Sequence, residues 1–125
     1  AGHFPVFLSP LLYYSCDTSL YYNERTGYPG RLVPALARGA VDLFLCGHHH
    51  AYERAEHPKL VQVACGADSL GWRRVLEEPS GFTRCIDRRG GFVEYIYDSV
   101  GDTIRAKAFD LNEEVIDEWT QNVRR

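Results

Sequence analysis

Two short apolar runs, each followed by a glycine, constrain the fold of this chain more than any other feature of its sequence. Residues 41–46 read VDLFLC before Gly47, and Leu60–Cys65 reads LVQVAC before Gly66. Continuous apolar runs of four to eight residues are typical of strands that are buried on both faces of a sheet. The sequence therefore predicts two buried strands around which the rest of the chain is arranged.

The other predicted elements complete a layered α/β arrangement. Residues 32–38 have helical spacing, with Gly39 as the C-terminal stop and Pro34 in the first turn. Residues 92–98 and Thr103–Asp110 alternate like the two arms of a hairpin, and a third, weaker strand is expected at 114–120. The segment 68–90 is expected to be mainly loop. The predicted fold class is α/β, with a mixed sheet and antiparallel carboxy-terminal strands in a single region over residues 1–125.

The composition is that of an ordinary globular protein, and it excludes several function classes. The 125 residues are 45% hydrophobic and 25% charged, and their net charge of -3 argues against a nucleic-acid phosphate binder. No apolar run approaches the roughly 20 residues that span a bilayer, and no signal-peptide pattern opens the chain. The chain contains no Met, which indicates that it is part of a longer protein.

The four cysteines do not form a C-x-x-C pair, so neither a zinc ribbon nor a thioredoxin-like site is indicated. Cys46 and Cys65 end the apolar runs and are expected to be buried thiols. Cys16 and Cys85 stand in polar segments and could form a bridge in a secreted protein. The compartment stays open from these observations.

Three consecutive histidines follow the first buried strand directly. His48, His49 and His50 come after Gly47 at the carboxyl end of that strand, where open α/β sheets build their sites. Alternate residues of an extended chain point the same way, so His48 and His50 can face one site. Neutral imidazoles bind Zn, Fe or Mn, and this pair can supply two ligands to one metal or one ligand each to two. A surface histidine cluster without a function is the alternative interpretation.

The residues around these histidines resemble the signature of a known family. Residues 47–54 read GHHHAYER, which is similar to the G-H-x-H-x-Y-E-R motif of purple acid phosphatases, within the calcineurin-like metallophosphoesterases. Residues 2–6 read GHFPV and resemble the G-H-x-P segment of the same family. By this resemblance, the chain is the carboxy-terminal half of a metallophosphoesterase domain, a β-sandwich with flanking helices.

The resemblance implies a binuclear metal centre, Fe with Zn, Mn or Fe. His3 and His48 would bind the divalent metal and His50 the neighbouring Fe(III), which places His48 and His50 in catalytic positions. The implied activity is that of an acid phosphatase, in which a metal-activated hydroxide hydrolyses a phosphate monoester substrate. The residues expected to support the metal ligands are Tyr52, Glu53 and Arg54.

The chain departs from the family pattern in one large respect. The D-x-G, G-D-x-x-Y and G-N-H-E motifs of the family's amino-terminal half are absent, and the bridging carboxylate is missing with them. The chain is therefore expected to be inactive alone and to need the amino-terminal half of the same parent protein, or another chain, as partner. A second hypothesis is a truncated, non-catalytic module of the same fold that binds metal or acts through contacts. The weakest hypothesis is a small α/β domain with incidental histidines.

Overall fold

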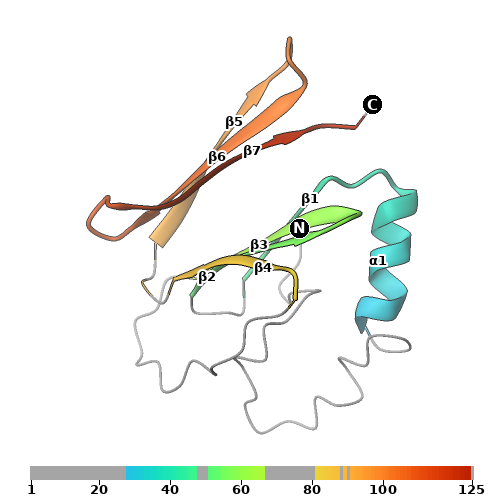
Figure 1. The fold of residues 1–125 in the computed structure, drawn as a ribbon, viewed down its shortest axis with the longest axis horizontal. Coiled ribbons are helices and arrows are strands. Elements are labelled where there is room, and N and C mark those ends of the chain that lie inside the picture. Colours follow the sequence, from blue (N-terminus) through green and yellow to red (C-terminus); the bar gives the residue numbers. More distant parts are fainter. Residues whose placement is uncertain (1–27, 48–50, 67–80, 88, 90, 125) are drawn as a thin grey trace, which may run out of the picture.

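The computed structural model describes residues 28–47, 51–66, 81–87, 89 and 91–124, which form one helix and two β-sheets (Figure 1). The elements in chain order are α1 (Tyr28–Arg38), β1 (Leu43–Cys46), β2 (Tyr52–His57), β3 (Leu60–Cys65), β4 (Thr83–Asp87), β5 (Gly91–Asp98), β6 (Thr103–Asp110) and β7 (Val115–Asn122). Sheet A has the strand order β1-β3-β2-β4, and sheet B has the order β5-β6-β7.

Sheet A is mixed, because one of its strand pairs is parallel. β1 runs parallel to β3, and β2 pairs with the other side of β3 in antiparallel orientation. β4 pairs antiparallel with β2, with a shift in register between Arg54 and Ala55. β3 thus lies inside the sheet, which explains why all of its residues except the buried Gln62 are apolar.

One face of sheet A is covered by α1. Phe44, Ala55 and Leu60 belong to a buried cluster against which Leu32 and Leu36 of the helix pack. The two leucines are four residues apart and therefore lie on one side of the helix. α1 and sheet A thus form the first two layers of the fold.

The opposite face of sheet A packs on sheet B. Tyr52 and Val63 of sheet A form a second buried cluster with Ala106, Ala108 and Trp119 of sheet B. The two alanines are among the residues of β6 that face sheet A, and their small side chains leave space for the two large aromatic rings. The molecule is therefore a two-sheet sandwich with a helix on one outer face.

The prediction of a mixed sheet followed by antiparallel strands is confirmed. The predicted strands Leu60–Cys65 and Thr103–Asp110 coincide with β3 and β6, and those at 41–46, 92–98 and 114–120 are β1, β5 and β7 with shifted ends. The fold is mostly β and carries one short helix in the described part of the chain. These layers alone do not distinguish a metallophosphoesterase sandwich from other two-sheet sandwiches.

Three local predictions were wrong. The helix begins earlier than expected, at Tyr28, so that Pro34 lies in its second turn. β2 forms at Tyr52–His57, where no strand was predicted, and β4 forms at Thr83–Asp87, inside the segment expected to be mainly loop. β2 and β4 pair with each other, and this long-range pairing is what a reading of local patterns misses.

The cysteines follow the sequence expectation in part. Cys46 is buried, whereas Cys65 is partly exposed, and both are free thiols. Cys85 is also a free thiol and lies in β4, with its Sγ 3.7 Å from the carbonyl oxygen of Ile116. Cys16 lies outside the described residues.

Candidate functional site

The predicted site residues fall into two groups. His3, His48 and His50 lie outside the described residues, so the metal-binding role assigned to them stays a prediction. The three residues expected to support these ligands open β2 and are described: Tyr52, Glu53 and Arg54. The structure therefore shows the second half of the motif.

β2 divides this half of the motif between the two faces of sheet A. Successive residues of a strand point to opposite faces. Tyr52 belongs to the cluster between the two sheets, and Arg54 contacts sheet B on the same face. Glu53 faces the other way, on the side of Ala55 and α1. The three neighbours in sequence thus act in two separate layers.

Tyr52 and Arg54 meet one carboxylate of the opposite sheet, that of Asp117 in β7. The Tyr52 hydroxyl donates to Asp117 Oδ2 at 2.6 Å, and Arg54 Nε donates to the same oxygen at 2.7 Å. The side chains of Arg54 and Asp117 are only 12% and 10% exposed. Burial and then the hydrogen bond to Asp117 raise the pKa of Tyr52. Burial is the largest single influence on the pKa of Arg54 and lowers it, but the hydrogen bond and charge of Asp117, together with the charge of Glu56, raise this pKa by more in sum.

A β-bulge brings Asp117 to this position. Ala108 of β6 lies opposite Asp117, but the next residue, Phe109, lies opposite Val115, so Ile116 is an extra residue in β7. A bulge of this kind lets two consecutive residues turn toward the same face of a sheet. Ile116 accordingly packs in the cluster between the sheets while Asp117 bonds Arg54.

Glu53 is fully buried on the opposite face of sheet A. Its carboxylate Oε1 accepts a hydrogen bond of 2.6 Å from the hydroxyl of Thr83 in β4. Burial, together with the Glu53 carboxylate, raises the pKa of Cys46 to about 12. Glu53 therefore joins β2 to β4, while the Cys46 thiol stays protonated and unreactive at neutral pH.

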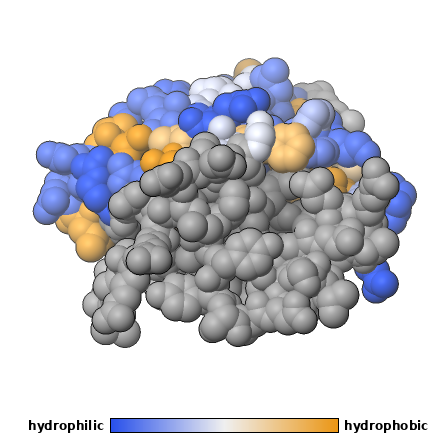
Figure 2. Space-filling view, turned by 60° about the horizontal axis from the view of Figure 1, so that its bottom comes forward, coloured by the Kyte–Doolittle hydropathy of each residue, from blue (hydrophilic) through white to orange (hydrophobic). Residues whose placement is uncertain are grey.

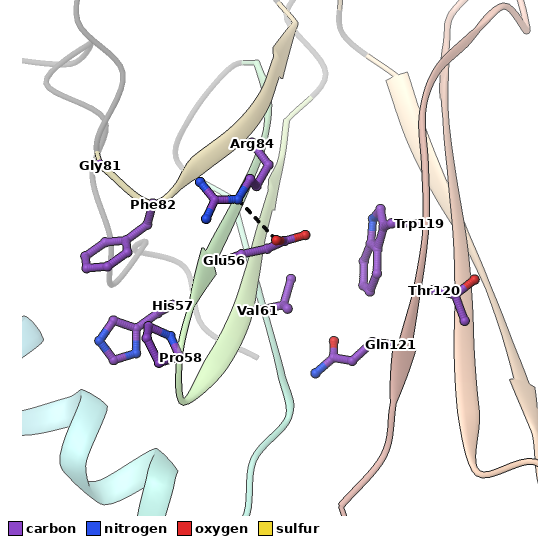
Figure 3. Close-up of a pocket in the computed structure, with 10 residues that line it drawn as sticks. All are labelled: Glu56, His57, Pro58, Val61, Gly81, Phe82, Arg84, Trp119, Thr120 and Gln121. Carbon is purple, nitrogen blue, oxygen red and sulfur yellow. Dashed lines mark hydrogen bonds and ion pairs between the residues drawn. The ribbon is translucent and has the colours of Figure 1, made fainter.

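A hollow of about 570 Å³ lies between the end of β2, the start of β4 and the outer part of β7 (Figure 3). Glu56 stands within it and accepts from two arginines, Arg54 and Arg84, the second at 3.2 Å. Trp119 forms the opposite side, with the guanidinium of Arg54 5.8 Å from its ring centroid. The residues that line the hollow are Glu56, His57, Pro58, Val61, Gly81, Phe82, Arg84, Trp119, Thr120 and Gln121.

The charged residues of this hollow form ion pairs with one another. The carboxylate of Glu56 forms ion pairs with two arginines, Arg54 and Arg84. In the part of the chain that the structure describes, no three His, Cys, Asp or Glu side chains gather to hold a metal ion. The same described residues include no helix that is long and apolar enough to cross a membrane.

The surface of sheet B is apolar at one end. Figure 2 shows hydrophobic residues among hydrophilic ones at the end of the molecule where Figure 1 places the turn between β6 and β7. Phe92 and Val115 are each about half exposed, and Leu111 is 69% exposed. The Phe92 ring stacks on Phe109 with centroids 5.1 Å apart. This outer face of sheet B carries no helix in the described chain.

The fold and the site together define a two-sheet sandwich whose best-connected polar residues link its strands and sheets. No family model and no curated protein match the chain. Among solved structures, the chain is similar to GAP50, described as the anchor in the inner membrane complex of Plasmodium. The TM-score is 0.74 at 21% sequence identity, and the match covers 99% of this chain and 36% of GAP50. At this identity the likeness concerns the fold.

This comparison corrects the family assignment made from the motif. The resemblance to purple acid phosphatases is wrong, since no family model matches and a solved structure that shares the fold is described as an anchor. The inferred phosphoesterase activity is wrong with it, as is the description of the chain as an iron- and zinc-dependent hydrolase. Tyr52, Glu53 and Arg54, which were expected to support metal ligands, make contacts between strands and sheets, and such contacts need no metal centre.

Sequence reasoning missed the partners of these motif residues. Asp117 and Thr83 complete the polar contacts, yet they lie 63 and 30 residues away from Arg54 and Glu53. Asp117 carried no clear signal, because residues 114–120 read EVIDEWT and contain two other acidic residues. Thr83 carried none, since its segment was expected to be mainly loop.

Proposed function

We propose that this chain is a non-catalytic interaction module that joins a protein partner by extending sheet A at β1. The proposal is supported by the fold likeness to an anchor protein of a membrane complex. It is also supported by the contacts of Tyr52, Glu53 and Arg54, the residues expected to support the metal ligands, which join strands and sheets of this fold. The metal-binding prediction for the histidines is independent of this proposal.

The observation that carries the proposal is the character of β1. Within the described chain β1 pairs only with β3, so it lies at the edge of sheet A. Its sequence is Leu43-Phe44-Leu45-Cys46, with Phe44 4% and Cys46 8% exposed. Edge strands are usually protected by Lys, Pro or a bulge, and parallel strands are usually interior. β1 has the sequence of an interior strand in an edge position.

The backbone of β1 offers a defined set of groups to a partner strand. The carbonyl of Asp42 accepts from the Val61 amide of β3 at 2.9 Å. In a strand, the N–H and C=O of one residue point to the same side, and the side alternates along the chain. Phe44 and Cys46 therefore bond toward β3, whereas the N–H and C=O groups of Leu43 and Leu45 point away from it. A strand of the partner would bond these four groups.

The partner strand would come from another protein chain, and a further segment of the same parent protein is the alternative. The chain spans 36% of the length of the solved structure it matches. A sheet that continues beyond β1 would bury the outer edge of Leu43 and Leu45 in the same way that β3 is buried. Such strand addition takes its affinity from main-chain hydrogen bonds.

Photo-crosslinking in the protein's own cells tests this proposal. A diazirine analogue of leucine is placed at Leu45 or, as a matched control, at Leu111, which is 69% exposed in the β6–β7 turn. The proposal predicts a protein crosslink from position 45 and little from position 111. The Leu43→Pro substitution removes one outward N–H at the first residue of an edge strand, where proline is tolerated, and should abolish the crosslink.

The Leu43→Ala variant separates the backbone from the side chain. It shortens the same side chain but keeps the N–H, so the crosslink from position 45 should persist. Thermal unfolding of both variants verifies that the sandwich is intact. Equal crosslinking from positions 45 and 111, or a crosslink that Leu43→Pro leaves unchanged, contradicts joining through β1.

A further inference from the structure

β5 is a second open edge, at one side of sheet B, and it is regular along its whole length. All eight residues Gly91–Asp98 pair with β6 without a shift in register. In the chain as described, no strand pairs with the other side of β5. Its sequence, GFVEYIYD, contains neither Lys nor Pro, and β5 has no bulge. These are the devices by which edge strands usually avoid pairing with other chains.

The side chains of β5 are apolar and exposed to an unusual degree for an edge strand. Phe92, Ile96 and Tyr97 are 51%, 50% and 56% exposed. Two of them, Phe92 and Ile96, share the outer face of sheet B with Glu94, because Glu94 is two residues from each of them and alternate residues of a strand face the same side. A long, regular edge of this composition is a template for adding a strand.

The charges of β5 favour a second copy of this chain as the occupant and select one register. We infer that two copies pair through β5 in antiparallel orientation, with Tyr95 opposite the same tyrosine of the second copy. This register sets Glu94 opposite Ile96 and Phe92 opposite Asp98. Moving it by two residues sets Glu94 opposite either itself or Asp98, and like charges directly opposite each other are destabilising.

The neighbouring strand β6 supports the same arrangement. Lys107 lies directly opposite Glu94 on β6, and Arg105 lies opposite Ile96. The acidic residues of two paired β5 strands would therefore lie between two basic rows, one from each copy. The result is a continuous six-stranded antiparallel sheet with two-fold symmetry, in which each copy contributes the same edge.

Sedimentation equilibrium of the purified chain tests this inference with a matched pair of variants. Ile96→Glu and Ile96→Lys both replace one exposed isoleucine with a charged side chain. In the inferred register the first faces Glu94 of the second copy with like charge, and the second faces it with opposite charge. Because two symmetric pairs change, the dimer Kd of I96E should exceed that of I96K by at least about five-fold.

Two controls make the result decisive. Leu43→Pro should leave dimerisation unchanged, which separates this edge from the one used in the proposed function. Mixing Glu94→Cys with Ile96→Cys chains should give a disulfide-linked dimer between the new thiols, whereas Ile96→Cys alone should not. A wild-type chain that stays monomeric at millimolar concentration overturns the inference, as do equal Kd values for I96E and I96K.

Discussion

The two faces of sheet A bury charge in different ways. Toward α1, the carboxylate of Glu53 is fully buried and bonds the neutral hydroxyl of Thr83 within the same sheet. Toward sheet B, the carboxylate of Asp117 in β7 accepts hydrogen bonds from both Arg54 and Tyr52 of sheet A. On one face, a hydrogen bond to a carboxylate joins two strands of the same sheet. On the other face, an ion pair joins one sheet to the other.

This difference explains why a catalytic interpretation of the motif was attractive and wrong. A Tyr-Glu-Arg sequence at the start of a strand necessarily sends its middle residue to one face and the outer two to the other. Buried charges persist in proteins when they are paired and hydrogen-bonded. A Tyr-Glu-Arg sequence can therefore make structural contacts in a sandwich as readily as it can support the ligands of a metal centre.

The largest expected effect comes from breaking the ion pair between the sheets. Asp117→Ala leaves the buried guanidinium of Arg54 and the hydroxyl of Tyr52 without their shared acceptor, and should lower the free energy of unfolding by about 3 kcal/mol. Urea denaturation measures it. Glu56→Ala is the matched control, because Glu56 also binds Arg54 but is 40% exposed, and it should cost about 1 kcal/mol or less. Equal losses in the two variants would show that Asp117 does not hold the sheets together.

The next effect concerns the other face. Thr83→Val keeps the shape of the side chain but removes the hydroxyl that donates to Glu53, and should cost about 1 to 2 kcal/mol. Thr83→Ser retains the donor and should cost less. The comparison is made by chemical denaturation, and a Ser variant as unstable as the Val variant would mean that packing, not the hydrogen bond, joins β4 to β2.

A smaller effect is expected from pH. Burial first, and then the nearby Lys59, lower the pKa of His57 from its ordinary value of 6.5. The unfolded chain therefore binds a proton at a higher pH than the folded chain does, so stability is lost as the pH falls below about 6.5. Thermal unfolding at pH 7.5 and 5.5 should show this loss. The His57→Gln variant should lose less stability between these two pH values, and an unchanged slope would contradict a role for this histidine.

The smallest effect is predicted on the exposed surface of sheet B. Lys107 Nζ and Glu118 Oε2 lie 3.5 Å apart, with side chains 37% and 54% exposed. Glu118→Gln should change the free energy of unfolding by no more than about 0.5 kcal/mol, because solvent screens such pairs. A loss close to that of Asp117→Ala would erase the distinction between buried and exposed ion pairs in this sandwich.

Much of the fold could be predicted from the sequence, because its strands carry local patterns. Leu60–Cys65 and Thr103–Asp110 were predicted with the bounds that the structure shows, the first from a continuous apolar run and the second from alternation. β4 could not be predicted, since Thr83–Asp87 owes its form to pairing with β2. Tyr52, Glu53 and Arg54 were interpreted as part of a metal site, and the strand that begins at Tyr52 was not predicted.

In the candidate site, the motif residues could be predicted from the sequence, but the residues that they bind could not. Tyr52, Glu53 and Arg54 could be singled out, but their partners depend on a β-bulge and on strand order, neither of which a local pattern reveals. The bulge places Ile116 and Asp117 together on the inner side of β7, contrary to strict alternation. The predicted metal ligands His3, His48 and His50 stay predictions.

Amide hydrogen exchange of β1, measured by NMR on the chain alone, tests most directly whether one side of this strand is open to a partner strand. If it is, the N–H groups of Leu43 and Leu45 should exchange at least about ten-fold faster than those of Phe44 and Cys46, which bond toward β3. Slow exchange at all four residues would show that β1 is already paired on both sides and would contradict the proposed function.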